Sequence, residues 1–158
     1  MSLIPPFTQE TATQKVKRAQ DLWNTKDPGK VVKAYTPNSV WRNRTTFVTG
    51  HAAIERFLTA KWERELEYRL RKELFAFMGN RIAVQFWYEF RDRDDGLKWK
   101  RCYGLEHWTF DADGTMRDRR MSGNDALIEE GGRWFENVDD VNSVDLEALH
   151  AKEWAKTA

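Results

Sequence analysis

The sequence predicts an α+β fold in which helices come first and a meander of long antiparallel strands follows. Apolar residues recur at helical spacing up to about Trp62, and from about Glu65 they alternate with polar residues. Turn-forming residues at 79–80, 94–96 and 111–114 separate the alternating runs, as expected of hairpins. Helices that precede such a meander are expected to cover one face of the sheet.

Three helical segments are expected before the sheet. Thr8 is the expected N-cap of the first helix, whose apolar positions are Ala12, Val16, Ala19, Leu22 and Trp23. A second, short helix follows residues 27–29, ends at residues 36–38, and carries Val31, Val32 and Tyr35. A third begins after Thr49-Gly50 and shows one apolar face, formed by Ala53, Ile54, Phe57, Leu58 and Trp62.

The strands are read from their period of two. A short strand at residues 39–44 presents Trp41 and Asn43 to the same side, and longer strands are expected near residues 66–75, 82–91, 97–110 and 115–122. Residues 1–124 are expected to form one domain. Residues 125–158 form an acidic C-terminal tail, with a short helix at 143–154 that packs on the same domain.

Composition excludes several classes of protein. The 158 residues are 41% hydrophobic, which is typical of a folded domain. The 26 Lys and Arg nearly balance the 25 Asp and Glu, so the sequence does not predict binding to nucleic acid or to a membrane surface. A single cysteine excludes an intramolecular disulfide. Because there is neither a signal peptide nor an apolar run of about 20 residues, we expect a cytoplasmic protein.

Residues suited to metals, phosphates or covalent catalysis are not grouped in the sequence. The three histidines and Cys102 show no metal-ligand spacing, so we expect no metal and no cofactor. There is no glycine-rich phosphate loop and no nucleophile motif. His107 occupies the strand phase opposite to Glu106 and is expected to face outward.

One stretch of the chain resembles a known superfamily. Tyr35, the run Ser39-Val40-Trp41-Arg42-Asn43 and the pattern Thr49-Gly50-x-x-x-Ile54-x-x-Phe57 resemble nuclear transport factor 2-like (NTF2-like) proteins, which include the SnoaL-like proteins and ketosteroid isomerases. The sequence of residues 41–84 resembles that of a bacterial branch of unknown function within that superfamily. The resemblance spans residues 8–124 and implies a cone, a curved antiparallel sheet wrapped around the N-terminal helices. It also implies a homodimer through the sheet face.

The resemblance bears on one chemistry in particular. It places Asn43 where the ketosteroid isomerases carry an aspartate base, and Glu106 where they carry a protonated acid that donates to an oxyanion. An amide cannot abstract a proton near neutral pH, so isomerase chemistry loses its base. Glu106 is nevertheless the candidate catalytic residue, as an acid or hydrogen-bond donor.

Strand phase predicts the wall of a pocket. If Glu106 points inward, Trp108 on its strand and Arg119 on the last strand do so too. Arg119 is then either the partner of Glu106 in a structural ion pair or an anchor for a ligand carboxylate. Asn43 either binds a polar group of the ligand or caps a turn. The remaining candidates are either pocket lining or ordinary core: Trp23, Trp41, Tyr88 and Trp108.

These observations favour a protein that binds a small organic ligand in a partly apolar pocket. The alternatives are a SnoaL-like, cofactor-independent enzyme with dehydratase, isomerase or hydrolase chemistry, and a domain that binds another protein through its sheet. The outer sheet face is the candidate dimer surface, or is simply solvated, and is expected to show Arg69, Arg71, Trp87 and Glu89.

Overall fold

The computed structural model describes residues 3–158 and contains the helices and strands in the expected order. Its α-helices are α1 (Gln9–Asn24), α2 (Pro28–Val31), α3 (His51–Arg64) and α4 (Leu146–Ala155). Its strands are β1 (Tyr35–Asn43), β2 (Thr46–Thr49), β3 (Glu65–Met78), β4 (Arg81–Asp92), β5 (Lys98–Phe110) and β6 (Met116–Leu127). Short 3₁₀ turns occur at Val32–Ala34, Glu130–Gly132 and Val141–Ser143.

The start of α1 follows from its first residues. The Thr8 hydroxyl accepts from the backbone N–H of Thr11, and the Thr11 hydroxyl accepts from the backbone N–H of Thr8. This reciprocal pair satisfies two N–H groups that a helix end leaves free. The predicted N-cap at Thr8 is therefore confirmed.

The region between α2 and α3 differs from the sequence prediction. Tyr35 was expected in the second helix but is extended (φ −114°, ψ 150°) and begins β1, so the helical assignment of Tyr35 and the end of the helix at 36–38 are wrong. Residues 46–49 form β2, a strand that the sequence did not predict because four residues are too few to show a period. Arg44, with φ of 57°, turns the chain between the two strands.

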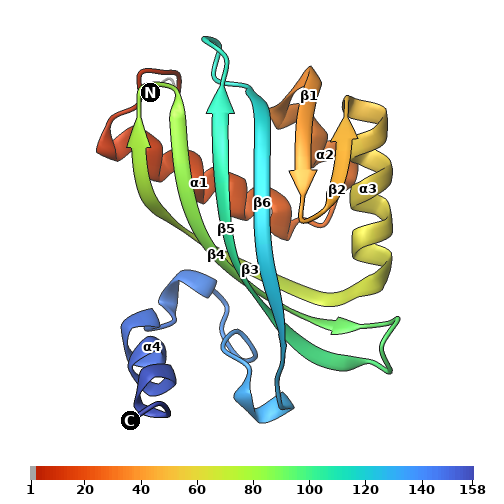
Figure 1. Cartoon of the computed structure of the whole chain (residues 1–158), viewed down its shortest axis with the longest axis vertical. Helices are drawn as coiled ribbons and strands as arrows, with labels where there is room; N and C mark the ends of the chain where they lie inside the picture. Colours follow the sequence, from red (N-terminus) through yellow and green to blue (C-terminus); the bar gives the residue numbers. More distant parts are fainter. Residues whose placement is uncertain (1–2) are drawn as a thin grey trace.

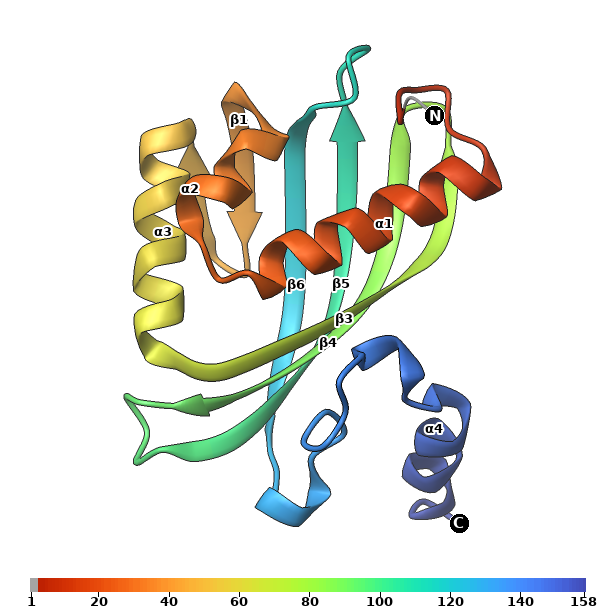
Figure 2. The same cartoon turned by 180° about the vertical axis from the view of Figure 1, so that it is seen from behind.

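The six strands form one curved sheet in the order β2-β1-β6-β5-β4-β3. Neighbouring strands are antiparallel except β1 and β6, the first and last strands in the chain, which are parallel. Figure 2 shows α1 lying across the concave face of the sheet, with α3 beside β1 and β2. None of the helices in residues 3–158 is long and apolar enough to cross a membrane.

The main core fills the space between the concave face and the helices. It includes Val16 and Trp23 of α1, Ile54 and Leu58 of α3, and the inward residues of every long strand. Because those inward residues alternate with outward ones along each strand, the positions of Glu106 and Arg119 inside the cone follow from the same phase that buries the core.

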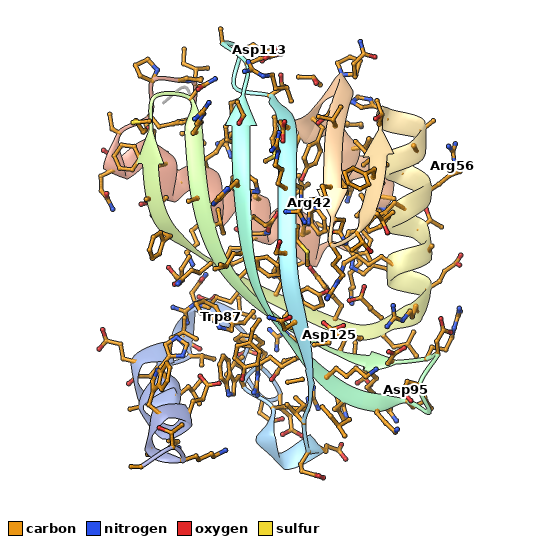
Figure 3. All side chains as sticks on the ribbon, viewed as in Figure 1. Arg42, Arg56, Trp87, Asp95, Asp113 and Asp125 are labelled. Carbon is orange, nitrogen blue, oxygen red and sulfur yellow. The ribbon has the colours of Figure 1, made fainter. Side chains whose placement is uncertain are left out.

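The segment after β6, residues 128–158, covers part of the outer sheet face (Figure 1). Trp87 and Glu89, which were expected on an uncovered face, are only 7% and 2% exposed. Phe135 packs on Trp87, and the Glu89 carboxylate accepts hydrogen bonds from the backbone N–H groups of Trp134 and Phe135. Figure 3 shows Trp87 among the side chains between the sheet and this segment. At this end the outer face is neither solvated nor available to a partner.

A close contact across β4 and β5 yields a first prediction. A Cβ added at Gly104 would lie 1.9 Å from Cζ of the buried Phe86 ring. We expect Gly104→Ala to lower the free energy of unfolding by about 2–3 kcal/mol, because the added methyl group overpacks a core that has little room to adjust. Urea denaturation measures the change. Gly131→Ala is the control, since no heavy atom lies within 4 Å of a Cβ there; equal losses in the two variants would contradict the assigned contact.

Candidate functional site

Three charged side chains from three strands meet inside the cone. Lys72 of β3, Glu106 of β5 and Arg119 of β6, here called the ionic cluster, are 2%, 1% and 3% exposed. One Glu106 carboxylate oxygen accepts from Lys72 Nζ, and the other accepts from Arg119 Nε at 2.7 Å and from Trp108 Nε1 at 3.1 Å. The ion pair expected between Glu106 and Arg119 is thus present, and Lys72 is a further cation that the sequence analysis missed.

The two cations determine the protonation of Glu106. Burial alone would raise the pKa of this carboxyl, but Lys72 and Arg119 outweigh burial and hold the pKa at about 2. Glu106 is therefore a carboxylate at neutral pH and has no proton to donate. A catalytic role for Glu106 stays a prediction, and in this geometry that role is electrostatic rather than that of an acid.

Lys72 lies in an aromatic surrounding. Its ammonium is 4.8 Å from the centre of the Phe86 ring, and similar distances separate it from the rings of Trp23 and Trp108. Burial lowers its pKa to about 8; Arg119 acts in the same direction and Glu106 opposes the shift. The signal in the sequence was the position of Lys72 itself, in the apolar phase of β3 between Leu70 and Leu74.

Asn43 joins the ionic cluster to a cavity. Its side-chain oxygen accepts from Arg119 Nη1 at 3.0 Å. Asn43 also lines a cavity of about 420 Å³, here called the mouth cavity, that lies between the β1–β2 turn, α3 and β4. The other wall residues that matter below are Arg44, Phe57, Lys61, Glu65 and Tyr88.

The candidate ligand-binding residues divide into two layers. Asn43 and Tyr88 line the mouth cavity. Trp23 and Trp41 stack on each other at 5.7 Å beneath it, with the Arg119 guanidinium 4.8 and 4.5 Å from their ring centres. Trp23 and Trp108 also border a separate small hollow of about 60 Å³ along α1. Direct ligand contact by the buried layer stays a prediction.

The wall of the mouth cavity carries paired charges that sequence reasoning did not identify. Arg44 binds Asp125 at 2.7 Å, and Lys61 binds Glu65 at 2.8 Å. The Lys61 ammonium also lies 4.1 Å from the centre of the Tyr88 ring. Lys61 and Glu65 are spaced as i and i+4 across the end of α3, a pairing that the sequence contained but that usually marks an exposed helix.

None of the histidines, and not the cysteine, belongs to the ionic cluster. His107 is exposed on the outer face, as predicted, and His51 contacts the Tyr35 carbonyl oxygen at 2.7 Å. Cys102 is buried, and burial raises the pKa of its thiol to about 12. Within residues 3–158, no group of three His, Cys, Asp or Glu side chains is arranged to hold a metal ion.

The ionic cluster predicts unequal effects of two substitutions. Glu106→Gln leaves two buried cations without an anion and is expected to lower the free energy of unfolding by about 3 kcal/mol. Lys72→Met removes one hydrogen bond to Glu106, but it leaves Glu106 paired with Arg119 and removes a charge that burial disfavours. We therefore expect a smaller loss in the free energy of unfolding, of about 1 kcal/mol. Urea denaturation at neutral pH measures both.

The ion pairs of Glu106 also predict a pH dependence of stability, which a comparison of the wild-type protein with Glu106→Gln measures. The pKa of Glu106 is lower in the folded chain, about 2, than its ordinary value of 4.5. Its stabilising contribution is therefore complete above the ordinary value and is lost as the pH falls from about 4.5 towards 2. The wild-type protein should lose more stability over this range than Glu106→Gln does. Parallel losses would show that Glu106 is not the titrating group.

The comparisons with known proteins agree with this fold. A solved structure of SalBIII, described as an epoxide hydrolase/cyclase-like enzyme in pyran ring formation in polyether salinomycin, superposes with a TM-score of 0.67 at 16% identity, covering 76% of this chain and 98% of that one. A putative SnoaL-like polyketide cyclase from Shewanella denitrificans OS-217 gives 0.62 at 17% identity, covering 72% and 90%. Identities this low show the fold alone, an NTF2-like α+β cone, and confirm the resemblance seen in the sequence.

Among curated proteins, none matches the chain. Residues 5–136 match a family described as a protein of unknown function, DUF1348. The match covers β1 to β6 and the first part of the segment after them, and so includes every residue of the ionic cluster and of the mouth cavity. The chain belongs to the DUF1348 family.

Proposed function

We propose that the protein binds a small, partly apolar organic molecule in the mouth cavity. The observation that carries this proposal is the position of Asn43, which both lines the cavity and contacts Arg119 of the ionic cluster. A volume of about 420 Å³ lies in the range of ligand sites, which combine apolar walls with a few oriented polar groups. Phe57 and Tyr88 supply the aromatic wall.

Tyr88 is suited to orient a ligand by donating a hydrogen bond. Burial raises the pKa of its hydroxyl well above the ordinary value, so the group remains protonated at any physiological pH. Arg44 Nη2 lies 3.4 Å from the hydroxyl oxygen and occupies one of its acceptor positions. The Tyr88 proton is thereby directed towards an acceptor, which a ligand carbonyl or hydroxyl in the cavity would supply.

A cofactor-independent enzyme is the second candidate. The two structural neighbours are described as a cyclase and an epoxide hydrolase/cyclase-like enzyme, which makes such chemistry reasonable for this fold. The specific observation in its favour is Lys72, whose pKa of about 8 suits a proton donor near neutral pH. Glu106 would then hold Lys72 in place as a carboxylate, while Asn43 would orient the substrate.

Filling the mouth cavity tests the binding proposal. Ala60 is an exposed residue of α3 on the cavity wall, so Ala60→Trp is expected to fill the cavity and weaken binding at least tenfold while leaving the fold intact. Thermal-shift and fluorescence titrations with a library of small organic acids, amides, ketones and alcohols provide the measurement. Ala52→Trp is the control, because Ala52 is exposed on the same helix but outside this cavity. Equal binding by both variants would contradict the site.

We further propose that the protein forms a homodimer through the part of the outer sheet face that residues 128–158 leave uncovered. This part exposes Leu105 and Met78 and contains a groove of about 460 Å³ bordered by Ala83, His107 and Arg120. Exposed apolar side chains gathered on an antiparallel sheet are typical of an interface.

Leu105→Arg tests the dimer. Leu105 is 58% exposed on β5, so a charge there should halve the mass measured by light scattering while the chain stays folded. Phe47→Arg, on β2 and away from this groove, should leave the mass unchanged. A wild-type protein that is monomeric throughout the micromolar range would overturn the proposal.

A further inference from the structure

We propose that the ligand of the mouth cavity is a small organic anion, with a carboxylate or enolate at one end and an apolar body at the other. The inference deepens the proposed function and rests on it, since it assigns a chemical class to the molecule in the same cavity. Three features of the interior support it: an excess of positive charge, an excess of hydrogen-bond donors, and the place where both meet the cavity wall.

The charges inside the cone do not balance. At the cavity wall, Arg44 is paired with Asp125 and Lys61 is paired with Glu65. Deeper inside, Lys72 and Arg119 share the single carboxylate of Glu106. The ionic cluster therefore carries one positive charge more than it neutralises, within a surrounding of indole and phenyl rings. An uncompensated buried charge is unfavourable, and a bound anion would compensate it.

Hydrogen-bond donors are in excess as well. The indole N–H groups of Trp41 and Trp62 are buried and have no acceptor among residues 3–158. The Trp41 side chain as a whole is only 2% exposed. Both oxygens of Glu106 are already occupied by donors, so the cluster offers these indoles no further strong acceptor. Because buried donors without partners are rare in folded proteins, the interior is arranged for a molecule that brings acceptors.

Ring contacts and one hydrogen bond connect these unmatched groups to residues of the cavity wall. Trp41 contacts Phe57 of the wall at 6.0 Å between ring centres, and the Arg119 guanidinium lies 4.5 Å from the centre of the Trp41 ring. Trp62 contacts Tyr68, which in turn contacts Tyr88 of the wall. Arg119 Nη1 reaches the wall through its hydrogen bond to the neutral side-chain oxygen of Asn43, which lines the cavity. A ligand carboxylate entering beside Asn43 would offer Arg119 a charged acceptor in place of an amide.

The identity of residue 43 makes this proposal testable. An aspartate there would occupy the same volume as asparagine, accept the same hydrogen bond from Arg119, and cancel the excess charge. Asn43→Asp should therefore leave the unfolding temperature unchanged or raise it, while it weakens the binding of anions. A merely structural role for Asn43 predicts no effect of this substitution on ligand charge preference.

The experiment measures charge preference with matched probes. Pairs of carboxylates and their primary amides, such as benzoate with benzamide, cinnamate with cinnamamide and hexanoate with hexanamide, are titrated at constant ionic strength while tryptophan fluorescence is followed. In the wild-type protein we expect at least one carboxylate to bind tenfold or more tightly than its amide. In Asn43→Asp the preference for the carboxylate should disappear, and in Lys72→Met it should fall to a similar extent. Ala52→Trp, outside the cavity, should retain it.

The outcomes separate this inference from the function on which it rests. Amides that bind as tightly as their acids, or an unchanged preference in Asn43→Asp, would overturn the anion proposal and leave ligand binding in the cavity intact. Binding by no member of any pair, together with no difference between Ala60→Trp and the wild-type protein across the wider library, would overturn both.

Discussion

The structure depends on one carboxylate that is shared between distant strands. Glu106 lies on β5, and its partner Lys72 lies on β3, so the lysine side chain must cross β4 to reach it. The crossing is possible because Phe86 and Gly104 are register partners: with no side chain on Gly104, the Phe86 ring lies flat over it and Lys72 passes above the ring. A glycine and an aromatic ring on adjacent strands thus make room for the contact between two opposite charges.

The same arrangement governs the chemistry available to the site. A carboxylate between two cations is ionised and cannot donate, so the hydrogen-bond donors of the interior include Lys72, Tyr88 and the indoles of Trp41 and Trp62, but not Glu106. At the cavity wall, Asn43 supplies neither a negative charge nor a base, because an amide neither neutralises Arg119 nor takes up a proton.

Periodicity in the sequence was sufficient for most of the fold and for two of the three residues of the ionic cluster. The alternation of β5 and β6 predicted that Glu106 and Arg119 face inward together, and their ion pair follows from that phase. Lys72 was missed because strand periodicity sorts residues by polarity, and a lysine in an apolar phase is visible only when its partner is known. Tyr35 and residues 46–49 were misassigned or missed because their strands form through pairing with β6 and β1, which local pattern does not report. The cover over Trp87 could not be foreseen, since it depends on where an acidic tail packs.

A second buried ion pair shows how this protein arranges buried charges whose role is structural. Glu89 and Arg101, on the outer face, are 2% and 5% exposed and neutralise each other at 2.8 Å. The remaining capacity of Glu89 is taken by the backbone N–H groups of Trp134 and Phe135, and Arg101 donates to the Gly132 carbonyl oxygen. Every group there has a partner, and the pair anchors residues 128–158 to the sheet. The ionic cluster around Glu106 is buried as deeply but is left with a surplus cation, and it contacts Trp41, whose indole N–H has no acceptor among residues 3–158. Since the same chain completes one buried network and leaves the other incomplete, the incomplete one is where a ligand would supply the missing charge and acceptors.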